Sequence, residues 1–211
     1  MKTAHLIDVL AQDAPVRWSL SGRLAVAFAA GAAATAVVFV LSVGMRPDLS
    51  VAGQTLRVQF KLLYALTLMS GAAGAVSRVG RPGAAPGPWT AVLGAAPVLL
   101  TAAVVLELLA TPAPSWLARL VGANALYCLA ILPALAAPPL VFLMLALRAG
   151  APERPGLAGA AAGLAAGGIA AVFYASHCPD DSPLFVAVWY TCAIAVVVAA
   201  GWLAGTRLLK W

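Results

Sequence analysis

Long apolar runs separated by short polar segments make up most of this 211-residue chain. Each run comes close to the length of about 20 residues that a helix needs to cross a hydrocarbon layer about 30 Å thick. The runs cover Leu24 to Val43, Val58 to Ser77, Trp89 to Leu109, Val121 to Leu147, Leu157 to Ser176 and Leu184 to Ala204. The pattern predicts an all-α fold, a polytopic membrane helix bundle with about six transmembrane helices.

Composition supports this prediction. The chain is 63% hydrophobic and only 9% charged, which leaves too few polar side chains to cover a water-soluble fold. The lipid bilayer is therefore the expected partner of most of its surface. The net charge of +6 comes from basic residues scattered singly at the ends of apolar runs, so we expect no direct nucleic-acid partner.

The lysines and arginines predict an orientation, because positive residues are retained on the cytoplasmic side of a membrane. In a six-helix arrangement, one side of the membrane holds Lys2, Arg17, Arg23, Arg78, Arg81, Arg148, Arg154, Arg207 and Lys210, and the other holds Arg46, Arg57, Lys61 and Arg119. Both termini lie on the richer side. We therefore expect a cytoplasmic amino-terminal segment over 1–23, a transmembrane domain over 24–204 and a short cytoplasmic tail over 205–211.

Small residues recur at a spacing of four in the fifth run, at Gly159, Gly163 and Gly167. Such faces let helices approach closely. Tight packing within one bundle is the simpler interpretation, and a homodimer face is the alternative.

Two ionisable residues fall inside predicted spans, Lys61 and Glu107. Intramembrane charge often marks function, but both lie near a boundary, where a side chain can extend to the interface. A structural ion pair or an ion site is the other interpretation, with Arg119 as a candidate partner for Glu107. The fourth run also contains three prolines that should kink or interrupt its helix, Pro133, Pro138 and Pro139. These features leave a small membrane transporter or channel as an alternative function.

The predicted topology separates the three cysteines. Cys178 lies in the outer HCPDDSP loop, Cys128 about two turns inside the outer end of the fourth run, and Cys192 near the middle of the sixth. Cys128 and Cys178 can form a redox-sensitive disulfide in an oxidising compartment if helix packing brings their Cα atoms to about 6 Å.

The outer loop itself permits two interpretations. His177, Cys178 and the carboxylates of Asp180 and Asp181 supply soft-metal or reactive-thiol chemistry within five residues, although their spacing matches no standard zinc site. Alternatively, the loop is structural, and Asp180, Asp181 or Ser182 caps the sixth helix.

The amino-terminal segment is the longest part predicted on the inner side. Residues 3–14 predict a short amphipathic helix whose apolar face carries Leu6, Ile7 and Leu10, with Asp8 and Asp13 exposed. An acidic polar face disfavours anionic lipid, whereas a cytoplasmic protein can take such an apolar face into a groove.

Catalytic signatures are absent from the sequence. It contains no phosphate loop, nucleophile elbow, CxxC pair or HExxH motif. We therefore expect a protein that is not an enzyme and has no resident cofactor, apart from transient capture of a heavy-metal ion.

Three segments together resemble one family: the opening MKTAHLIDVLAQDAPV, the RPDL at Arg46 to Leu49, and HCPDDSPLFVAVWY from His177 to Tyr190. They are similar to the NrsF family of bacterial membrane anti-sigma factors. The resemblance implies a protein of the bacterial inner membrane that holds an extracytoplasmic-function (ECF) sigma factor inactive at the cytoplasmic face. It implies release of that sigma factor under oxidative or heavy-metal stress.

The resemblance also implies roles for individual residues. The two stress-sensing cysteines of the family fall on Cys128 and Cys178, with His177 as a neighbouring candidate metal ligand. Cys192 has no place in the pattern and is expected to be a small packing residue. The resemblance makes the inner amino-terminal segment the natural sigma-factor contact, which assigns binding to Leu6, Ile7, Asp8, Leu10 and Asp13.

Overall fold

The computed structural model describes residues 18–81, 83 and 87–209. Six helical spans in these ranges are long and apolar enough to cross a membrane: α2 (Leu20–Ser42), α4 (Leu56–Val79), α5 (Trp89–Ala110), α7 (Ala125–Leu147), α8 (Pro155–Ala175) and the composite span Pro183–Leu208. The short helices α3 (Leu49–Ala52), η1 (Ala113–Ser115) and α6 (Trp116–Val121) lie in the connections. The described residues contain no strand, so the all-α prediction with six spans is confirmed.

The composite span changes its helical character near its start. It begins as α9 (Pro183–Phe185), passes through a π-helical turn (Val186–Tyr190) and continues as α10 (Thr191–Leu208). Ser182 caps this span, because its hydroxyl accepts a hydrogen bond from the backbone N–H of Leu184 at 3.2 Å. Of the three capping residues considered from the sequence, Ser182 is therefore the one that caps the sixth span.

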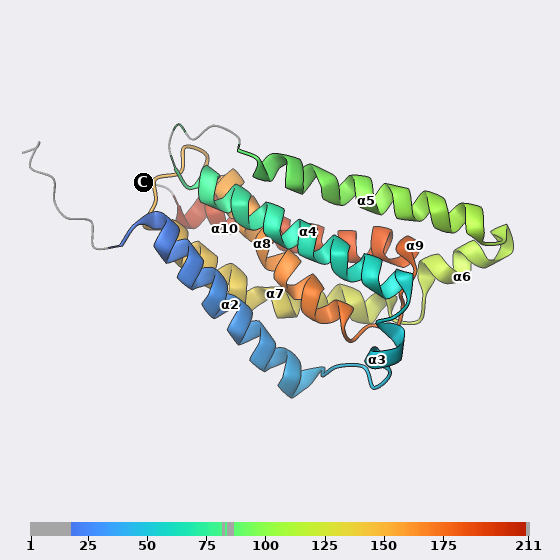
Figure 1. Ribbon diagram of the computed structural model, residues 1–211. Coiled ribbons are helices and arrows are strands. Elements are labelled where there is room, and N and C mark those ends of the chain that lie inside the picture. Colours follow the sequence, from blue (N-terminus) through green and yellow to red (C-terminus); the bar gives the residue numbers. More distant parts are fainter. Residues whose placement is uncertain (1–17, 82, 84–86, 210–211) are drawn as a thin grey trace, which may run out of the picture.

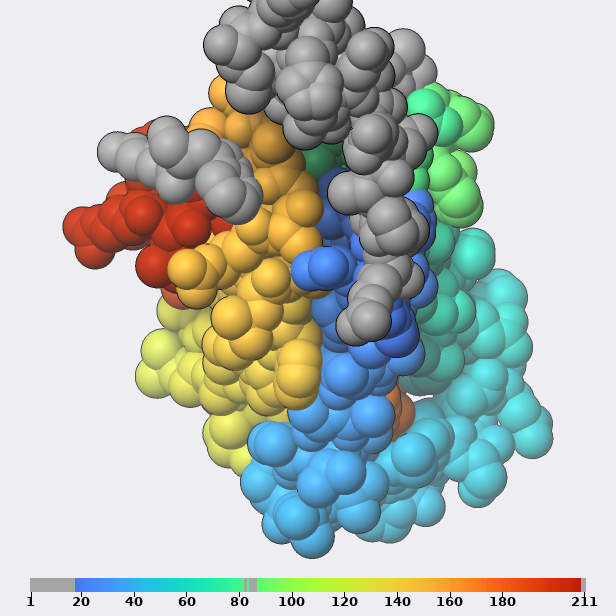
Figure 2. Space-filling view, turned by 90° about the vertical axis from the view of Figure 1, so that its left-hand side faces the viewer, coloured from blue at the N-terminus to red at the C-terminus, as the bar shows by residue number. Residues whose placement is uncertain are grey.

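Helix α8 is the centre of the bundle, since it packs against α10, α4 and α7, while α2 packs on α7 and α5 packs on α4 (Figure 1). The start of α2 and the end of α10 lie at the same end of the bundle, here called the terminal end (Figure 1). The loop between α8 and α9 lies at the opposite, distal end. Figure 2 views the terminal end, where the connection before α8 lies beside the start of α2.

Glycines allow α8 and α10 to pack with their backbones in contact. A Cβ atom on Gly159 would lie 2.1 Å from the carbonyl oxygen of Gly201, and one on Gly163 would lie 2.6 Å from that of Val197. Both distances are too short for any side chain. The small-residue face of α8 therefore serves packing within one bundle, as the simpler interpretation of the sequence predicted.

The prolines do not interrupt α7, which is helical throughout Ala125–Leu147. Of the two effects expected of these prolines, a kink or an interruption, the interruption was wrong. Pro139 has no N–H to donate to the carbonyl of Leu135 four residues earlier. The hydroxyl of Thr35 on α2 donates to that carbonyl instead, at 3.0 Å. Gly31, one turn before Thr35, lets α2 approach, since a Cβ there would lie 2.6 Å from the Cα of Pro139. A neighbouring helix thus supplies the missing hydrogen bond.

Candidate functional site

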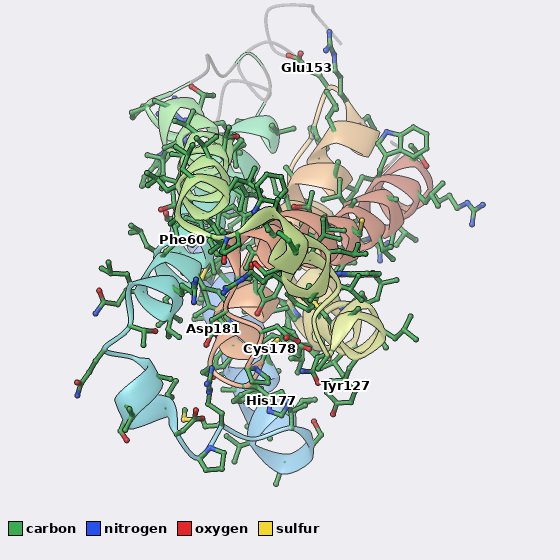
Figure 3. All side chains as sticks on the ribbon, turned by 90° about the vertical axis from the view of Figure 1, so that its right-hand side faces the viewer. Phe60, Tyr127, Glu153, His177, Cys178 and Asp181 are labelled. Carbon is green, nitrogen blue, oxygen red and sulfur yellow. The ribbon has the colours of Figure 1, made fainter. Side chains whose placement is uncertain are left out.

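The loop between α8 and α9 gathers most of the polar chemistry of the distal end. It carries His177, Cys178 and Asp181, which lie together in Figure 3. The backbone N–H groups of His177 and Cys178 both donate to the carbonyl of Tyr174, each at 3.0 Å. These bonds close the last turn of α8 and direct the following residues back over the bundle.

Lys61 on α4 forms hydrogen bonds to this loop. Its side chain is fully buried, and Nζ donates to the carbonyl oxygen of Cys178 at 2.7 Å, to the Asp180 carbonyl at 3.3 Å and to Oδ1 of Asp181 at 2.7 Å. Three acceptors compensate an ammonium group that would otherwise be costly to bury. The structure therefore excludes the interpretation that Lys61 extends to the interface, and supports the structural pair.

Arg46, in the connection after α2, also forms hydrogen bonds to the loop. Its guanidinium donates to Oδ2 of Asp181 at 2.8 Å and binds both carboxylate oxygens of Asp48 at 2.7 Å. The backbone N–H of Arg46 also donates to the carbonyl of Ser176 at 3.1 Å. Hydrogen bonding to Arg46 lowers the pKa of Asp48, and the two carboxylates together raise the pKa of Arg46 despite its partial burial. This cluster includes the RPDL segment and links it directly to the loop.

Asp180 binds the backbone just before α7 rather than the start of the sixth span. Its carboxylate accepts hydrogen bonds from the backbone N–H groups of Ala123 at 3.2 Å and Asn124 at 2.9 Å, and from Nδ2 of Asn124 at 2.9 Å. Negative charge at a helix amino terminus is stabilising. Gly122 permits the approach, because its φ is +60° and a Cβ there would lie 2.8 Å from the Asp180 carboxylate. The loop is thus tied to the helix that carries Cys128.

Glu107 on α5 binds the last residue of the loop and two nearby arginines. The hydroxyl of Ser182 donates to Oε2 of Glu107 at 2.7 Å, while Arg119 lies 3.2 Å and Arg57 3.4 Å from Oε1. Glu107 is buried, so the pairing with Arg119 expected from the sequence is confirmed. The two intramembrane charges both serve the distal loop, and neither indicates a polar pathway through the bundle.

Cys128 and Cys178 lie in the same buried cluster, although they are 50 positions apart in the chain. Both are fully buried and neither forms a disulfide. Burial raises the pKa of the Cys178 thiol, an effect that the nearby Lys61 ammonium partly offsets. The thiol is therefore protonated at neutral pH and shielded from solvent.

Two tyrosine rings pack against this pair of cysteines. Tyr174 and Tyr190 are fully buried in the same cluster, with ring centroids 5.6 Å apart. Within the described part of the chain, their hydroxyls are the buried side-chain polar atoms that lack a partner of good hydrogen-bond geometry. The Lys61 ammonium lies 5.9 Å from the centre of the Tyr190 ring. Polar groups thus surround the thiols without forming a closed network.

His177 lies beside the cysteine pair and is engaged elsewhere. Its Nδ1 atom is 3.0 Å from the carbonyl oxygen of Gly44, and its ring lies 6.0 Å from the rings of Tyr127 and Tyr174 (Figure 3). Among residues 18–81, 83 and 87–209, no three His, Cys, Asp or Glu side chains are arranged to hold a metal ion. A metal bound by the two cysteines would therefore be held by few protein ligands.

Cys192 differs from the other two cysteines, because it lies on the exposed side of α10. The expectation that it packs inside the bundle was wrong. The residues assigned to sigma-factor binding, Leu6, Ile7, Asp8, Leu10 and Asp13, lie outside the described residues, and their role stays a prediction.

The whole chain is similar to proteins of one family. A family model described as NrsF, negative regulator of sigma F, matches residues 10–211. The chain belongs to the NrsF family. A probable anti-sigma-F factor NrsF of Azospira oryzae is 34% identical to it over 217 residues, and the anti-sigma-F factor NrsF of Caulobacter vibrioides is 34% identical over 224 residues. Both alignments cover all of each chain. No solved structure matches the fold.

For this NrsF family member, sequence reasoning identified the loop and its cysteines but not their attachments. The sequence left Lys61 open between extension to the interface and a structural pair, and it did not predict that Asp180 binds the start of α7. The available signal was charge: the loop has two acidic residues and no basic one, so its partners had to come from basic residues or helix amino termini at the same end of the bundle.

Proposed function

We propose that this chain is an anti-sigma factor of the bacterial inner membrane, which binds an ECF sigma factor and releases it under oxidative or heavy-metal stress. The observation that carries the proposal is the full-length similarity to relatives named as anti-sigma-F factors. The family description as a negative regulator agrees with a role in binding rather than catalysis.

The charge on the two ends of the bundle supports an orientation for this proposal. The described basic residues at the terminal end are Arg23, Arg78, Arg81, Arg148, Arg154 and Arg207, whereas those at the distal end are Arg46, Arg57, Lys61 and Arg119. Two of the four distal residues, Arg46 and Lys61, form ion pairs with Asp181, which offsets part of their positive charge. This distribution supports an orientation in which the terminal end faces the cytoplasm and binds the sigma factor there.

The stress signal acts on Cys128 and Cys178. An oxidant such as hydrogen peroxide converts one thiol to a sulfenic acid with loss of water, and the second thiol then displaces a second water to form the disulfide. A heavy-metal ion instead displaces the two thiol protons and is held by two thiolates. The burial of both cysteines in one cluster supports their action as a pair.

Either event changes the packing between α7, which carries Cys128, and the loop that joins α8 to the sixth span. Interiors packed as closely as that of α8 and α10 do not deform continuously, so a local change is passed along the helices. A tenfold loss of sigma-factor affinity needs only about 1.4 kcal/mol of coupling between the two ends.

The test of sensing is a reporter gene driven by the cognate sigma factor in the host. Serine replacement of Cys128 and Cys178 should leave repression intact and abolish induction by cadmium, chromate or peroxide. Cys192→Ser is the matched control, because Cys192 lies outside the buried cluster. Full induction in the double variant would refute the assignment of these cysteines.

A further inference from the structure

A basic pocket lies at the terminal end of the bundle, away from the cysteines. It has a volume of about 290 Å³ and lies between the end of α4 and the starts of α5 and α8. Three of its lining residues are arginines, Arg78, Arg81 and Arg154, and Trp89 and Leu157 add apolar surface. The pocket thus combines positive charge with a membrane-interface aromatic residue.

One carboxylate lines the same pocket. Glu153 is directed to the backbone, since its Oε1 accepts a hydrogen bond from the N–H of Gly83 at 2.8 Å. The guanidinium of Arg81 donates to the hydroxyl of Ser21 on α2, and that of Arg78 packs against Gly87. Among the lining residues that the structure describes, three are arginines and one is a carboxylate. This balance of charge favours an anionic group.

An apolar groove lies farther along the same face of α8. Leu157, which lines the pocket, is followed on the same helix face by Ala160 and Leu164, which line a groove of about 520 Å³ between α8 and α10. Positions three and seven residues apart share a face of a helix. Trp202 also lines the groove and packs against Gly156, the residue before Leu157, because a Cβ on Gly156 would lie 2.6 Å from its Nε1 atom.

Helix α5 leaves this face uncovered. It packs chiefly on α4, and the buried residues along its length are Ala96 and Glu107 alone. Leu157, Trp89 and Trp202 are each at least 40% exposed. A groove at this depth in a six-span bundle faces hydrocarbon rather than water.

We propose that the pocket and the groove together bind one anionic phospholipid. Its phosphate lies on Arg81 and Arg154, and one acyl chain follows α8 past Trp202 to Leu164. The joined charge and apolar groove distinguish this ligand from free phosphate, which has no apolar part. They also distinguish it from an acidic segment of a cytoplasmic protein, which does not reach a groove inside the membrane. Basic pockets between spans are known to select lipid headgroups in this way.

The test uses the full chain in phosphatidylcholine nanodiscs that contain a small fraction of phosphatidylglycerol with brominated acyl chains. Bromine quenches tryptophan fluorescence at close range, and a Trp202→Phe variant identifies the signal from the groove. We expect brominated phosphatidylglycerol to quench Trp202 at a far lower mole fraction than brominated phosphatidylcholine does, by about tenfold or more.

The double variant Arg81→Gln, Arg154→Gln should lose this preference, whereas Arg148→Gln should retain it, because Arg148 is exposed at the same end and does not line the pocket. Circular dichroism checks that each variant is folded. Equal quenching by the two lipids, or a preference that survives in the double variant, would overturn the proposal. So would loss of the preference on addition of millimolar inorganic phosphate or of an acidic peptide, since either result would identify a site for a free anion or a protein segment.

Discussion

Replacing Lys61 by methionine removes the buried ammonium that holds the Cys178 loop, with little change in side-chain volume. Lys61 donates to two carbonyls and one carboxylate of the loop, those of Cys178, Asp180 and Asp181. A hydrogen bond from a charged donor contributes about 1.5–3 kcal/mol. Asp181 keeps its bond to Arg46, so we count the loss as about 3 kcal/mol in the free energy of local loop opening.

A change of about 3 kcal/mol corresponds to a population of the open loop that is higher by roughly a hundredfold. The assay is alkylation of Cys178 by a maleimide in detergent, followed by peptide-resolved mass spectrometry. Because Cys178 is fully buried, it reacts only from the open state, and its alkylation rate should rise by the same factor of about a hundred.

Arg57→Met is the matched control on the same helix. Arg57 is about half exposed and lies 3.4 Å from the buried carboxylate of Glu107. Because Glu107 keeps Arg119 and Ser182 as partners, the loss of this one contact from an exposed arginine should cost no more than about 1 kcal/mol. Its removal should change the alkylation rate of Cys178 by less than about fivefold. If Lys61→Met changes that rate no more than Arg57→Met does, Lys61 is not what holds the loop closed.

Three further predictions concern stability, measured as resistance to unfolding by a denaturing detergent. Burial raises the pKa of Cys178. The contribution of this thiol to the free energy of unfolding should therefore be constant below the ordinary thiol pKa of about 8.5 and decline as the pH rises above it. The decline should be absent in Cys178→Ser. Gly159→Leu should unfold far more easily than Gly94→Leu, because a Cβ at Gly94 meets nothing within 4 Å; equal effects would contradict the α8–α10 packing. Thr35→Val should cost about 1–3 kcal/mol by leaving the Leu135 carbonyl without its donor, and a neutral result would show that the helix tolerates the gap.

Much of the fold could be predicted because membrane spans depend on length and composition, which are local properties of the sequence. All six spans overlap their predicted ranges. The behaviour of α7 could not be predicted, since the donor that replaces the missing N–H of Pro139 comes from Thr35, 104 positions earlier in the chain. Helix α2 must pack on α7 before that bond exists.

Part of the candidate site could likewise be predicted from the sequence, and part could not. Topology placed Cys178 and Cys128 near one end of the bundle, and the structure brings both into one cluster. Lys61 was undetermined, because a lysine near the end of a span either extends to the interface or pairs, and its partners lie about 120 positions away. Asp180 was one of three candidate caps for the helix that follows it, whereas its carboxylate binds the backbone at the start of α7. Contacts at such separations are set by helix packing.

The central claim is that this chain binds a sigma factor and releases it when Cys128 and Cys178 react with an oxidant or a heavy-metal ion. The measurement that tests it most directly is capture of the ECF sigma factors of the host by the purified full-length chain in detergent. It compares the intact chain with one lacking residues 1–20, each with and without oxidant.

We predict that the reduced, intact chain captures one sigma factor. Oxidation should weaken that capture at least about tenfold, and removal of residues 1–20 should abolish it. Failure of the folded, reduced chain to capture any sigma factor of its host would contradict the account.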